Sequence, residues 1–476
     1  MRANRRDLPP ARPGPSRREV GLCLGVAMTV LGAPIRRAVA EEAPAPRSLC
    51  AANASWNLRP PPAPASTVLS YDGTVPGPVL FARQGEEIAL RLENRLASRT
   101  SFHIAGMRLP NALDGVPGLT DKGIEAGTGA EIRIPARDAG LFAFGPADPS
   151  SAAEQAGRGL GGVLIVADPK DPEVDADILL VLKDWRLDQA SKPEESFADA
   201  TLRTGPGRLG NVFTIGALGE KRMMSLPPGG RFRVRLVNAC NARALPLKFD
   251  GMHPTLIGVS GQQSAAFTPL HGEMLLVPGG RFDLVCDIPA DARPPAEPQI
   301  RAMVGNGFPL LGVAVSDDAS RSGQPTPIAW LSDNGLPEFV DLRRATRVDL
   351  RVTRSLDPAD AKALAAADPT KLWALNGKSG SLTGVPLFSV KRGTPVTIAT
   401  TNTTDVPIVM KLNGHVARLL HPRDDGWVPY WVDVVLVAPN TTERLAFLAD
   451  NPGRWLFGGR ILEHLAGGQF GWFEVT

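Results

Sequence analysis

Histidine, cysteine and tyrosine are scarce in this chain of 476 residues, which contains six, four and two of them. The few His and Cys residues limit the metal sites that the chain can build, because imidazole and thiolate are the usual ligands of zinc and copper. The sequence shows no zinc-type spacing, no phosphate-binding loop and no Ser, His and Asp arrangement typical of a nucleophilic triad. It therefore predicts none of the functions that depend on these sites.

A strong charge of one sign is also lacking. The whole chain carries a net charge of +3, and residues 1–40 hold eight Arg against two acidic residues, which leaves −3 for residues 41–476. Such a remainder does not favour a nucleic-acid partner. No apolar run after residue 40 is long enough to cross a bilayer, so no transmembrane segment is predicted once residues 1–40 are removed.

The N-terminus has the features of an export signal. Arg17 and Arg18 lie in a twin-arginine pattern, and the apolar run at 21–33 is too short to span a membrane but typical of a signal peptide. Ala38, Val39 and Ala40 form a cleavage site of the A-x-A type. We therefore predict a twin-arginine signal peptide at 1–40 and a periplasmic mature protein. An N-terminal anchor is the alternative.

An internal repeat organises the rest of the chain. Three segments share a Gly, eight residues of strand-like pattern and an Asn, and they begin 144 and 164 residues apart, which is the spacing of domains. They are Gly85-EEIALRLE-Asn94, Gly229-GRFRVRLV-Asn238 and Gly393-TPVTIATT-Asn402.

Most of the chain between these segments also favours short strands with Gly and Pro turns. Six more strands are predicted at 130–134, 162–167, 177–182, 281–286, 433–437 and 442–448, and the best helical candidate is 357–367. Polar, turn-rich linkers near 168 and 316 divide the chain. We predict an all-β protein with β-sandwich domains at 41–168, 169–318 and 319–476.

Three cysteines remain after export, namely Cys50, Cys240 and Cys286. An exported protein can form disulfides. Cys240 and Cys286 both lie in strand-like runs of the middle domain, so they are the better candidates for a pair. Three separate thiols are the open alternative.

The C-terminal segment resembles the multicopper oxidase family. From Asn451 it reads NPGRWLFGGRILEHLAGGQFGWFEVT, where the family carries HCHxxxHxxxxM before a closing aromatic strand. In this alignment His464 is kept. The other ligand positions hold Gly458, Gly459, Arg460 and, for the axial Met, Gln469.

Two further regions resemble the same family. The segment from Thr100, TSFHIAGMRLPNALDGVPGLT, matches the first His-x-His motif and keeps His103. The segment from Ile408, IVMKLNGH, has the shape of HPxHLHGH, with His415 at the position of the non-ligand His. The remaining ligand positions of these motifs and of the second His-x-His motif hold Ala105, Gly145, Ala147, Ile408, Lys411 and Asn413.

The resemblance implies three consecutive cupredoxin-like domains of the Greek-key β-sandwich or barrel type. Ten of the twelve expected copper ligands are replaced, so it further implies the copper-ligand-depleted branch of the family, the branch that resembles FtsP (SufI). For that branch we expect no cofactor, no catalytic residues, and a binding or scaffold role with protein partners in the cell envelope, of the cell-division or envelope-stress type. The alternative is a copper-dependent, laccase-like oxidoreductase.

Lys411 and Arg460 fall where the family's trinuclear copper site would have histidines. One hypothesis is that these cations replace part of the positive charge of copper. The other is that both side chains point to solvent or pair with nearby carboxylates. His103 and His464 are expected to be buried packing residues.

Overall fold

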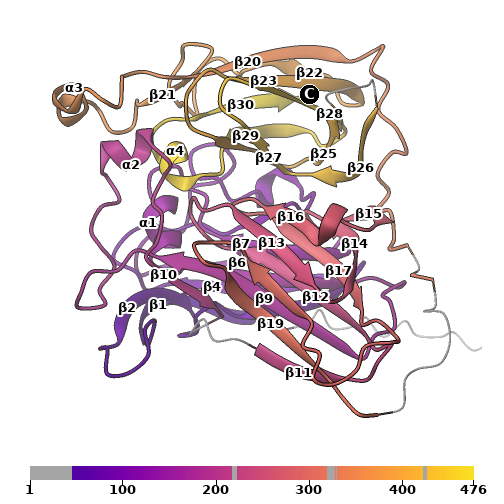
Figure 1. The fold of residues 1–476 in the computed structure, drawn as a ribbon. Helices are drawn as coiled ribbons and strands as arrows, with labels where there is room; N and C mark the ends of the chain where they lie inside the picture. Colours follow the sequence, from indigo (N-terminus) through magenta and orange to yellow (C-terminus); the bar gives the residue numbers. More distant parts are fainter. Residues whose placement is uncertain (1–44, 217–221, 319–326, 329, 422–425) are drawn as a thin grey trace, which may run out of the picture. The chain divides into compact units, whose positions relative to one another are not determined.

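The computed structural model describes residues 45–216, 222–318, 327–328, 330–421 and 426–476. The predicted signal peptide, including Arg17 and Arg18, lies outside these ranges. Residues 44–476 form one compact unit. Strands make up most of its regular structure, as the prediction of an all-β protein requires (Figure 1).

The first domain is a sandwich of two four-stranded sheets, ordered β2-β1-β4-β6 and β3-β8-β7-β5. Leu90 and Leu92 from the first sheet meet Phe142 and Leu164 from the second in one apolar core. The elements are β1 (Arg47–Trp56), β2 (Ser66–Tyr71), β3 (Val79–Arg83), β4 (Glu87–Asn94), β5 (His103–Ala105), η1 (Asn111–Leu113), β6 (Gly129–Pro135), β7 (Gly140–Gly145), α1 (Ala152–Gly157) and β8 (Gly162–Ala167).

The second domain has a five-stranded sheet, ordered β11-β19-β18-β13-β16, and a set of strands ordered β10-β9-β12-β17-β14-β15. Its elements are β9 (Ala176–Trp185), α2 (Ala200–Thr204), β10 (Val212–Ile215), β11 (Arg222–Leu226), β12 (Arg231–Asn238), β13 (Leu245–Asp250), β14 (His253–Val259), β15 (Gln262–Phe267), η2 (Leu270–Gly272), β16 (Glu273–Leu276), β17 (Arg281–Asp287), β18 (Gln299–Ala302) and β19 (Phe308–Val315).

The third domain has a five-stranded sheet, ordered β22-β30-β29-β24-β27, and a set of strands ordered β26-β25-β28-β23-β20-β21. Its elements are β20 (Thr346–Arg354), α3 (Ala361–Ala366), β21 (Trp373–Leu375), β22 (Ser389–Val390), β23 (Thr394–Asn402), β24 (Ile408–Leu412), β25 (Ala417–Leu420), β26 (Trp427–Val432), β27 (Val434–Val437), β28 (Thr442–Ala449), β29 (Gly453–Gly459), α4 (Leu462–Ala466) and β30 (Phe470–Val475).

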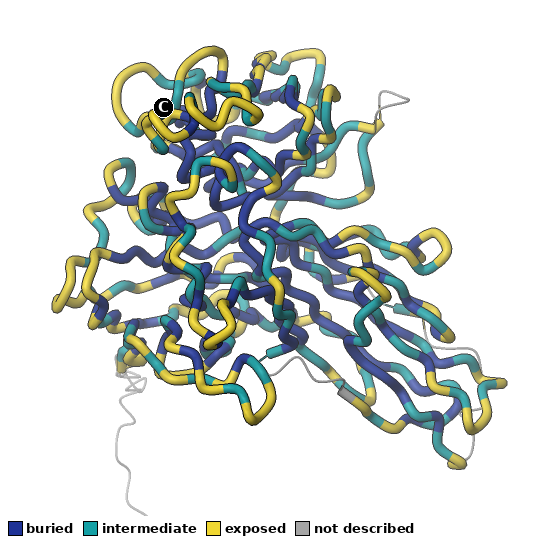
Figure 2. Tube along the Cα trace, turned by 60° about the vertical axis from the view of Figure 1, so that its left-hand side comes forward, coloured by how far each residue is buried: buried dark blue, intermediate teal, exposed yellow. Residues whose placement is uncertain are grey.

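One sheet continues from the second domain into the third. β15 pairs with β26 through Ser264 and Tyr430, and this bridge joins twelve strands into one sheet. One large apolar cluster also contains buried residues of both domains. Figure 2 shows long buried stretches inside each domain and exposed turns at the ends of the strands.

The three repeated segments form equivalent strands, namely β4, β12 and β23. Each has a parallel neighbour on one side and an antiparallel neighbour on the other, and each is preceded by a Gly with positive φ. The Asn that ends each strand is buried, and its side chain accepts a hydrogen bond from the amide two residues later. Its amide group donates to loop carbonyl oxygens. The repeated Asn therefore fixes the turn that leaves each strand.

The structure does not contain the disulfide predicted between Cys240 and Cys286, and both are free, buried thiols. Cys286 on β17 lies opposite Phe232 on β12, whereas Cys240 comes after the far end of β12. Asn238 lies six steps along the strand from Phe232, which is about 20 Å at ~3.3 Å per residue. Cysteines in a disulfide have Cα atoms only about 4–7 Å apart, so the register keeps this pair apart.

None of the helices in the described ranges has the length and apolar character that crossing a membrane requires.

Candidate functional site

Two strand pairs bring predicted ligand positions of the first and third domains together. β5 pairs with β7 so that His103 lies opposite Gly145, and β24 pairs with β29 so that Lys411 lies opposite Gly458. Lys411 Nζ then lies 2.5 Å from His103 Nε2. This contact joins two strands that are 308 residues apart in the chain.

The partners of His103 define its tautomer. Lys411 Nζ can only donate, so Nε2 of His103 accepts from it. Nδ1 therefore carries the proton and donates to the backbone oxygen of Asp114 at 2.6 Å, with the Asp114 carboxylate 3.3 Å away. His103 is buried, and both of its ring nitrogens are used. His103 therefore links the first and third domains through polar contacts, and the lone pair on its Nε2 atom faces the amine of Lys411.

Lys411 is half-buried, and its charged neighbours are two arginines and two aspartates. The pKa of Lys411 is lowered to about 8, mainly because the amine is poorly solvated; Asp433 and Asp114 oppose this shift, and Arg460 and Arg281 add to it. At neutral pH the amine is still mostly protonated, because its pKa lies above 7. The second hypothesis for Lys411 was that its side chain points to solvent or pairs directly with a carboxylate. Its amine instead contacts His103.

A buried ion pair lies beside Lys411 and connects the second and third domains. Arg281, at the start of β17, donates from Nη2 to Asp433 Oδ1 at 2.8 Å, and both side chains are almost fully buried. Burial would raise the pKa of Asp433, but Arg281 and Lys411 hold it below its ordinary value. Asp433 is therefore a carboxylate, and Arg281 is the cation that pairs with it directly.

Arg460 differs from the other cations because its guanidinium has no hydrogen-bond partner among the described residues. Its Nη1 atom is buried and unpaired. The side chain lies against Gly279, where an added Cβ would come within 2.1 Å of Nε. Burial and the neighbouring Arg281 lower the pKa of Arg460 to about 10, and Asp433 and Glu463 oppose this shift. The group is still a cation at neutral pH.

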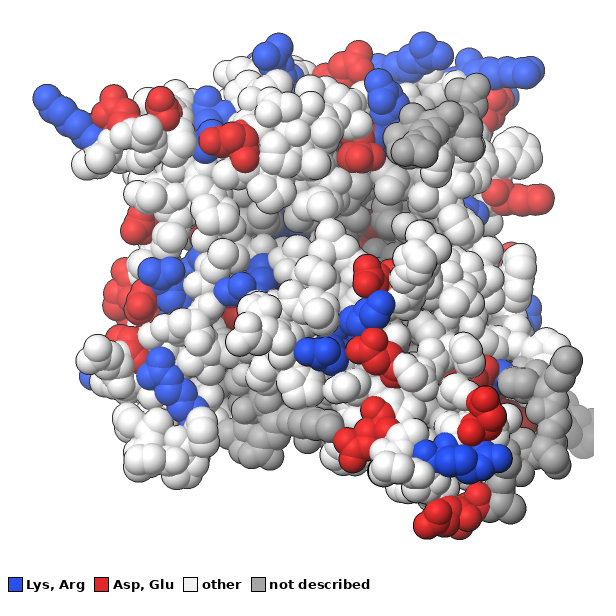
Figure 3. Space-filling view, viewed as in Figure 1, with Lys and Arg blue, Asp and Glu red and all other residues white. Residues whose placement is uncertain are grey.

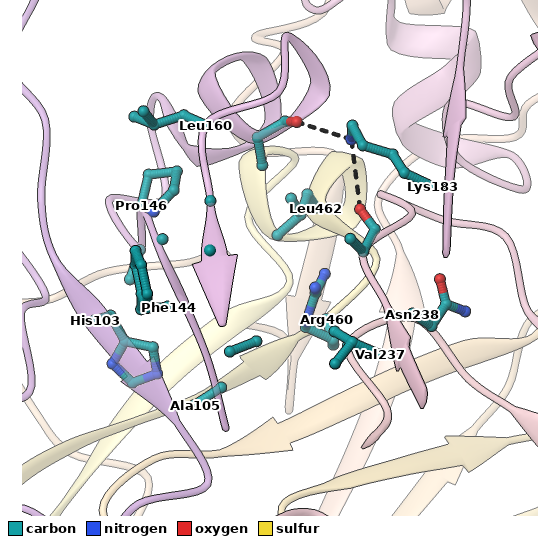
Figure 4. Close-up of a pocket in the computed structure, with 18 of the residues that line it drawn as sticks. His103, Ala105, Phe144, Pro146, Leu160, Lys183, Val237, Asn238, Arg460 and Leu462 are labelled. Carbon is teal, nitrogen blue, oxygen red and sulfur yellow. Dashed lines mark hydrogen bonds between the residues drawn. The ribbon is translucent and has the colours of Figure 1, made fainter. Parts of the chain in front are cut away.

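These side chains border a cavity of about 140 Å³ (Figure 4). The charged side chains and the histidine on its wall are His103, Lys183, Arg281, Lys411 and Arg460, and the described residues that line it include no Asp or Glu. Most of the remaining wall is Gly, Ala and apolar side chains such as Phe144, Leu160, Val237 and Leu462. The cavity is therefore cationic at a few points and apolar elsewhere.

Sequence reasoning missed Lys183 and Arg281 as parts of this site. Lys183 lies on β9 and is buried, with Nζ donating to the backbone oxygens of Ala156 at 2.9 Å and Ala239 at 3.4 Å (Figure 4). Burial lowers its pKa. Its position directly after the apolar run 178–182 was the available signal, because charged residues are almost never fully buried unless they are paired.

His464 lies on α4, in a different environment from His103. It is fully buried, its Nε2 pairs with the backbone oxygen of Gly205 at 2.8 Å, and its ring is 4.4 Å from that of Trp373. Burial lowers the pKa of His464 to about 4. Gln469 is buried nearby on the chain, and neither atom of its amide has a partner among the described residues.

The other predicted ligand positions serve the fold or the cavity wall. Ile408 is buried in the large core, and Asn413 donates to the Asp114 carboxylate at 3.0 Å. Ala147 belongs to a small apolar cluster with α4, and its amide donates to Ser101 Oγ at 2.8 Å. Ala105 and Gly145 line the cavity.

On the surface seen in Figure 3, Lys and Arg side chains alternate with Asp and Glu side chains and gather into no large patch of one sign.

Comparisons with known proteins agree with this architecture. Two family models, both described as multicopper oxidase, match residues 54–171 and 353–476, and together they cover just over half of the chain. The chain belongs to the multicopper oxidase superfamily. A relative from Mycobacterium tuberculosis, "Multicopper oxidase MmcO", is 26% identical over 90% of this chain and 88% of its own length.

Other members of the superfamily are similar over different shares of the chain. "Copper resistance protein A homolog" from Pseudomonas syringae pv. tomato is 35% identical over 25% of this chain and 20% of its own. The crystal structure of a multi-copper oxidase from Pseudomonas thermotolerans has a TM-score of 0.76 and 26% identity, over 91% of this chain and 99% of that one. These neighbours confirm the predicted cupredoxin-like β-sandwich domains.

The comparisons contradict the prediction that the protein has no cofactor. The reported relatives are named multicopper oxidases or copper resistance proteins, and copper is the cofactor that the superfamily implies. The prediction relied on single ligand positions, whereas the similarity extends over nearly the whole chain.

The described residues at the predicted ligand positions nevertheless do not fit copper. A Cβ on Gly459 would lie 2.5 Å from Gln469 Oε1, and one on Gly458 would lie 2.6 Å from Cβ of Phe470. The amine of Lys411 faces the Nε2 lone pair of His103, where a metal ion bound to that nitrogen would lie. Within the described ranges, no three His, Cys, Asp or Glu side chains are grouped to hold a metal.

Proposed function

We propose that the protein is an exported binding or scaffold protein of the bacterial cell envelope that uses the multicopper oxidase fold to present a binding surface and a cavity. Membership of the copper-ligand-depleted branch that resembles FtsP (SufI) is part of this proposal. A role of the cell-division or envelope-stress type then follows by analogy with that branch. The periplasmic location depends on the predicted twin-arginine signal at 1–40.

The hydrogen bond between Lys411 and His103 carries the proposal. At this point the family alignment places two metal-binding imidazoles, whereas here an amine donates to the one imidazole that is present. Asn413, at another predicted ligand position, donates to Asp114, which in turn accepts from His103. These positions form a polar network between domains, which favours a structural and binding role.

Capture of partners from the envelope tests the proposal. The mature protein, carrying an affinity tag and exported by its own signal, is cross-linked in living cells and purified from the periplasm. A tagged laccase-type relative exported in the same way is the matched control. We expect one or a few envelope proteins to be recovered in fixed ratio with the protein and to be absent from the control. Recovery of the protein without any such partner contradicts the proposal.

A copper-dependent, laccase-like oxidoreductase is the second candidate, and the names of the relatives favour it. The same purified protein is loaded with copper, desalted and assayed for oxygen consumption with a phenolic substrate. Turnover that a copper chelator abolishes supports this second function. Oxygen consumption equal to that of the metal-free blank supports the binding role.

A further inference from the structure

One cation on the wall of the cavity between the three domains, Arg460, has no direct hydrogen-bond partner among the described residues. Arg281 pairs with Asp433, Lys411 with His103, and Lys183 with two backbone oxygens. Arg460 alone among these cations makes no side-chain hydrogen bond within the described ranges, and its Nη1 atom is buried. Asp433 and Glu463 act on this guanidinium through space, but neither forms a hydrogen bond with it among the described residues. A buried cation without a direct partner is unfavourable, so Arg460 is the group on the wall best placed to bind an added anion.

The charged side chains on the cavity wall indicate that a ligand bound there should be an anion. Four cationic side chains line the cavity, and the described lining residues include no carboxylate. Like charges in a poorly solvated space repel each other, and an anion placed among them relieves this repulsion. Arginine is suited to the task, because its planar fork binds a carboxylate through two parallel hydrogen bonds.

The rest of the wall specifies the body of the ligand. In Figure 4, Phe144, Pro146 and Leu160 lie on one side of the site, and Arg460, Val237 and Leu462 lie on the other. A cavity of about 140 Å³ is close in size to an engineered apolar cavity of ~150 Å³ that binds benzene. An inorganic anion would leave the apolar wall without contacts, whereas a long acyl chain would exceed the volume.

Glycines create this space. Gly145 and Gly161 lie on the wall, and a Cβ added to either would approach its nearest neighbour only to 3.5 and 3.4 Å. Neither of them has a positive φ. A side chain at these positions would therefore extend into the cavity without straining the backbone, so the volume depends on their being glycine.

We propose that this cavity binds a small monocarboxylate with an apolar body of about the size of benzoate, and that the carboxylate pairs with Arg460. The body of the ligand packs against Phe144, Leu160 and Leu462, and Lys183 and Lys411 add to the positive potential around the carboxylate. This site needs no protein partner, so its test and the capture of envelope proteins can fail separately.

Isothermal titration calorimetry of the mature protein with benzoate tests the site, and benzamide is the neutral ligand of the same shape. We expect saturable binding of one benzoate per chain and affinity for benzamide at least tenfold lower. Arg460→Met, which keeps length and removes charge, should weaken benzoate binding by roughly tenfold to a hundredfold, since hydrogen bonds to charged groups account for about that factor. Arg91→Met, at an exposed arginine, should leave the affinity unchanged.

Gly145→Leu, which fills the cavity and keeps every cation, should abolish benzoate binding. This variant provides the test if Arg460→Met does not fold. Equal affinity for benzoate and benzamide, or undiminished binding by Gly145→Leu, overturns the proposal. So does the absence of any benzoate binding to the parent protein. Sulfate that binds as tightly as benzoate would show a plain anion site and overturn the assignment of an apolar body.

Discussion

His103 Nε2 accepts a hydrogen bond from Lys411 Nζ at 2.5 Å, and this contact joins β5 of the first domain to β24 of the third. The other ring nitrogen, Nδ1, faces the backbone oxygen of Asp114 at 2.6 Å. The pair lies at the edge of the cavity in which Arg460 has no partner. The contact that joins the domains and the arginine proposed to bind the ligand therefore belong to the same cavity.

The amine of Lys411 should make the free energy of unfolding depend on pH in the alkaline range. The pKa of Lys411 is about 8 in the folded protein and has an ordinary value of 10.5, so the unfolded chain binds more protons between those values. The free energy of unfolding should therefore rise between pH 8 and 10.5, by at most ~3 kcal/mol. Urea unfolding of the parent and of Lys411→Met should show this rise only in the parent. Parallel profiles for the two proteins would rule the effect out.

His464 should contribute to loss of stability in acid. Its pKa is about 4 in the folded protein against an ordinary 6.5, so stability is fully present above pH 6.5 and is lost as the pH falls toward 4. His464→Phe should reduce this acid loss. At neutral pH it should cost about 1–3 kcal/mol, because the backbone oxygen of Gly205 loses its partner. His253→Phe, at an exposed histidine, is the control and should change neither quantity.

The pair formed by Arg281 and Asp433 should behave as one unit in unfolding measurements. Arg281→Met leaves a buried carboxylate without its cation, which should cost about 3–5 kcal/mol. Adding Asp433→Asn to that variant should restore part of the loss. The exposed pair of Arg91 and Glu131 is the matched control, and breaking it should cost about 0–1 kcal/mol. Strict additivity of the two buried substitutions would show that the side chains act independently.

Replacing Arg17 and Arg18 together with Lys should retain the precursor in the cytoplasm, because the twin-arginine receptor recognises that pair as an address. Cell fractionation followed by immunoblotting gives the measurement, and replacement of Arg5 and Arg6 is the control at a second arginine pair. Normal periplasmic amounts of the first variant would show that another route exports the protein.

The sequence was sufficient to predict much of the fold, because period-two patterning and a repeated Gly-to-Asn segment reflect local preferences of the chain. The strands predicted at 130–134 and 162–167 are β6 and β8, and the three repeats are β4, β12 and β23. The role of the repeated Asn was not evident, because its partners include backbone oxygens 30 to 38 residues away that only the folded chain brings near.

The site was harder to predict, because its chemistry arises from contacts over long sequence distances. Lys411 meets His103 across 308 residues, and Arg281 meets Asp433 across 152. No pattern in the sequence reports these distances or the unpaired state of Arg460. The disulfide prediction failed for a related reason, since the strand register that separates Cys240 from Cys286 is a property of the sheet.

A crystal structure with 4-bromobenzoate, recorded at the bromine absorption edge, tests the central claim most directly. We expect one anomalous peak inside the cavity, the carboxylate bound to Arg460, the bromine toward Phe144 and Leu160, and Lys411 still on His103. An empty cavity, or a metal ion on His103 Nε2 with Lys411 turned away, would contradict the account.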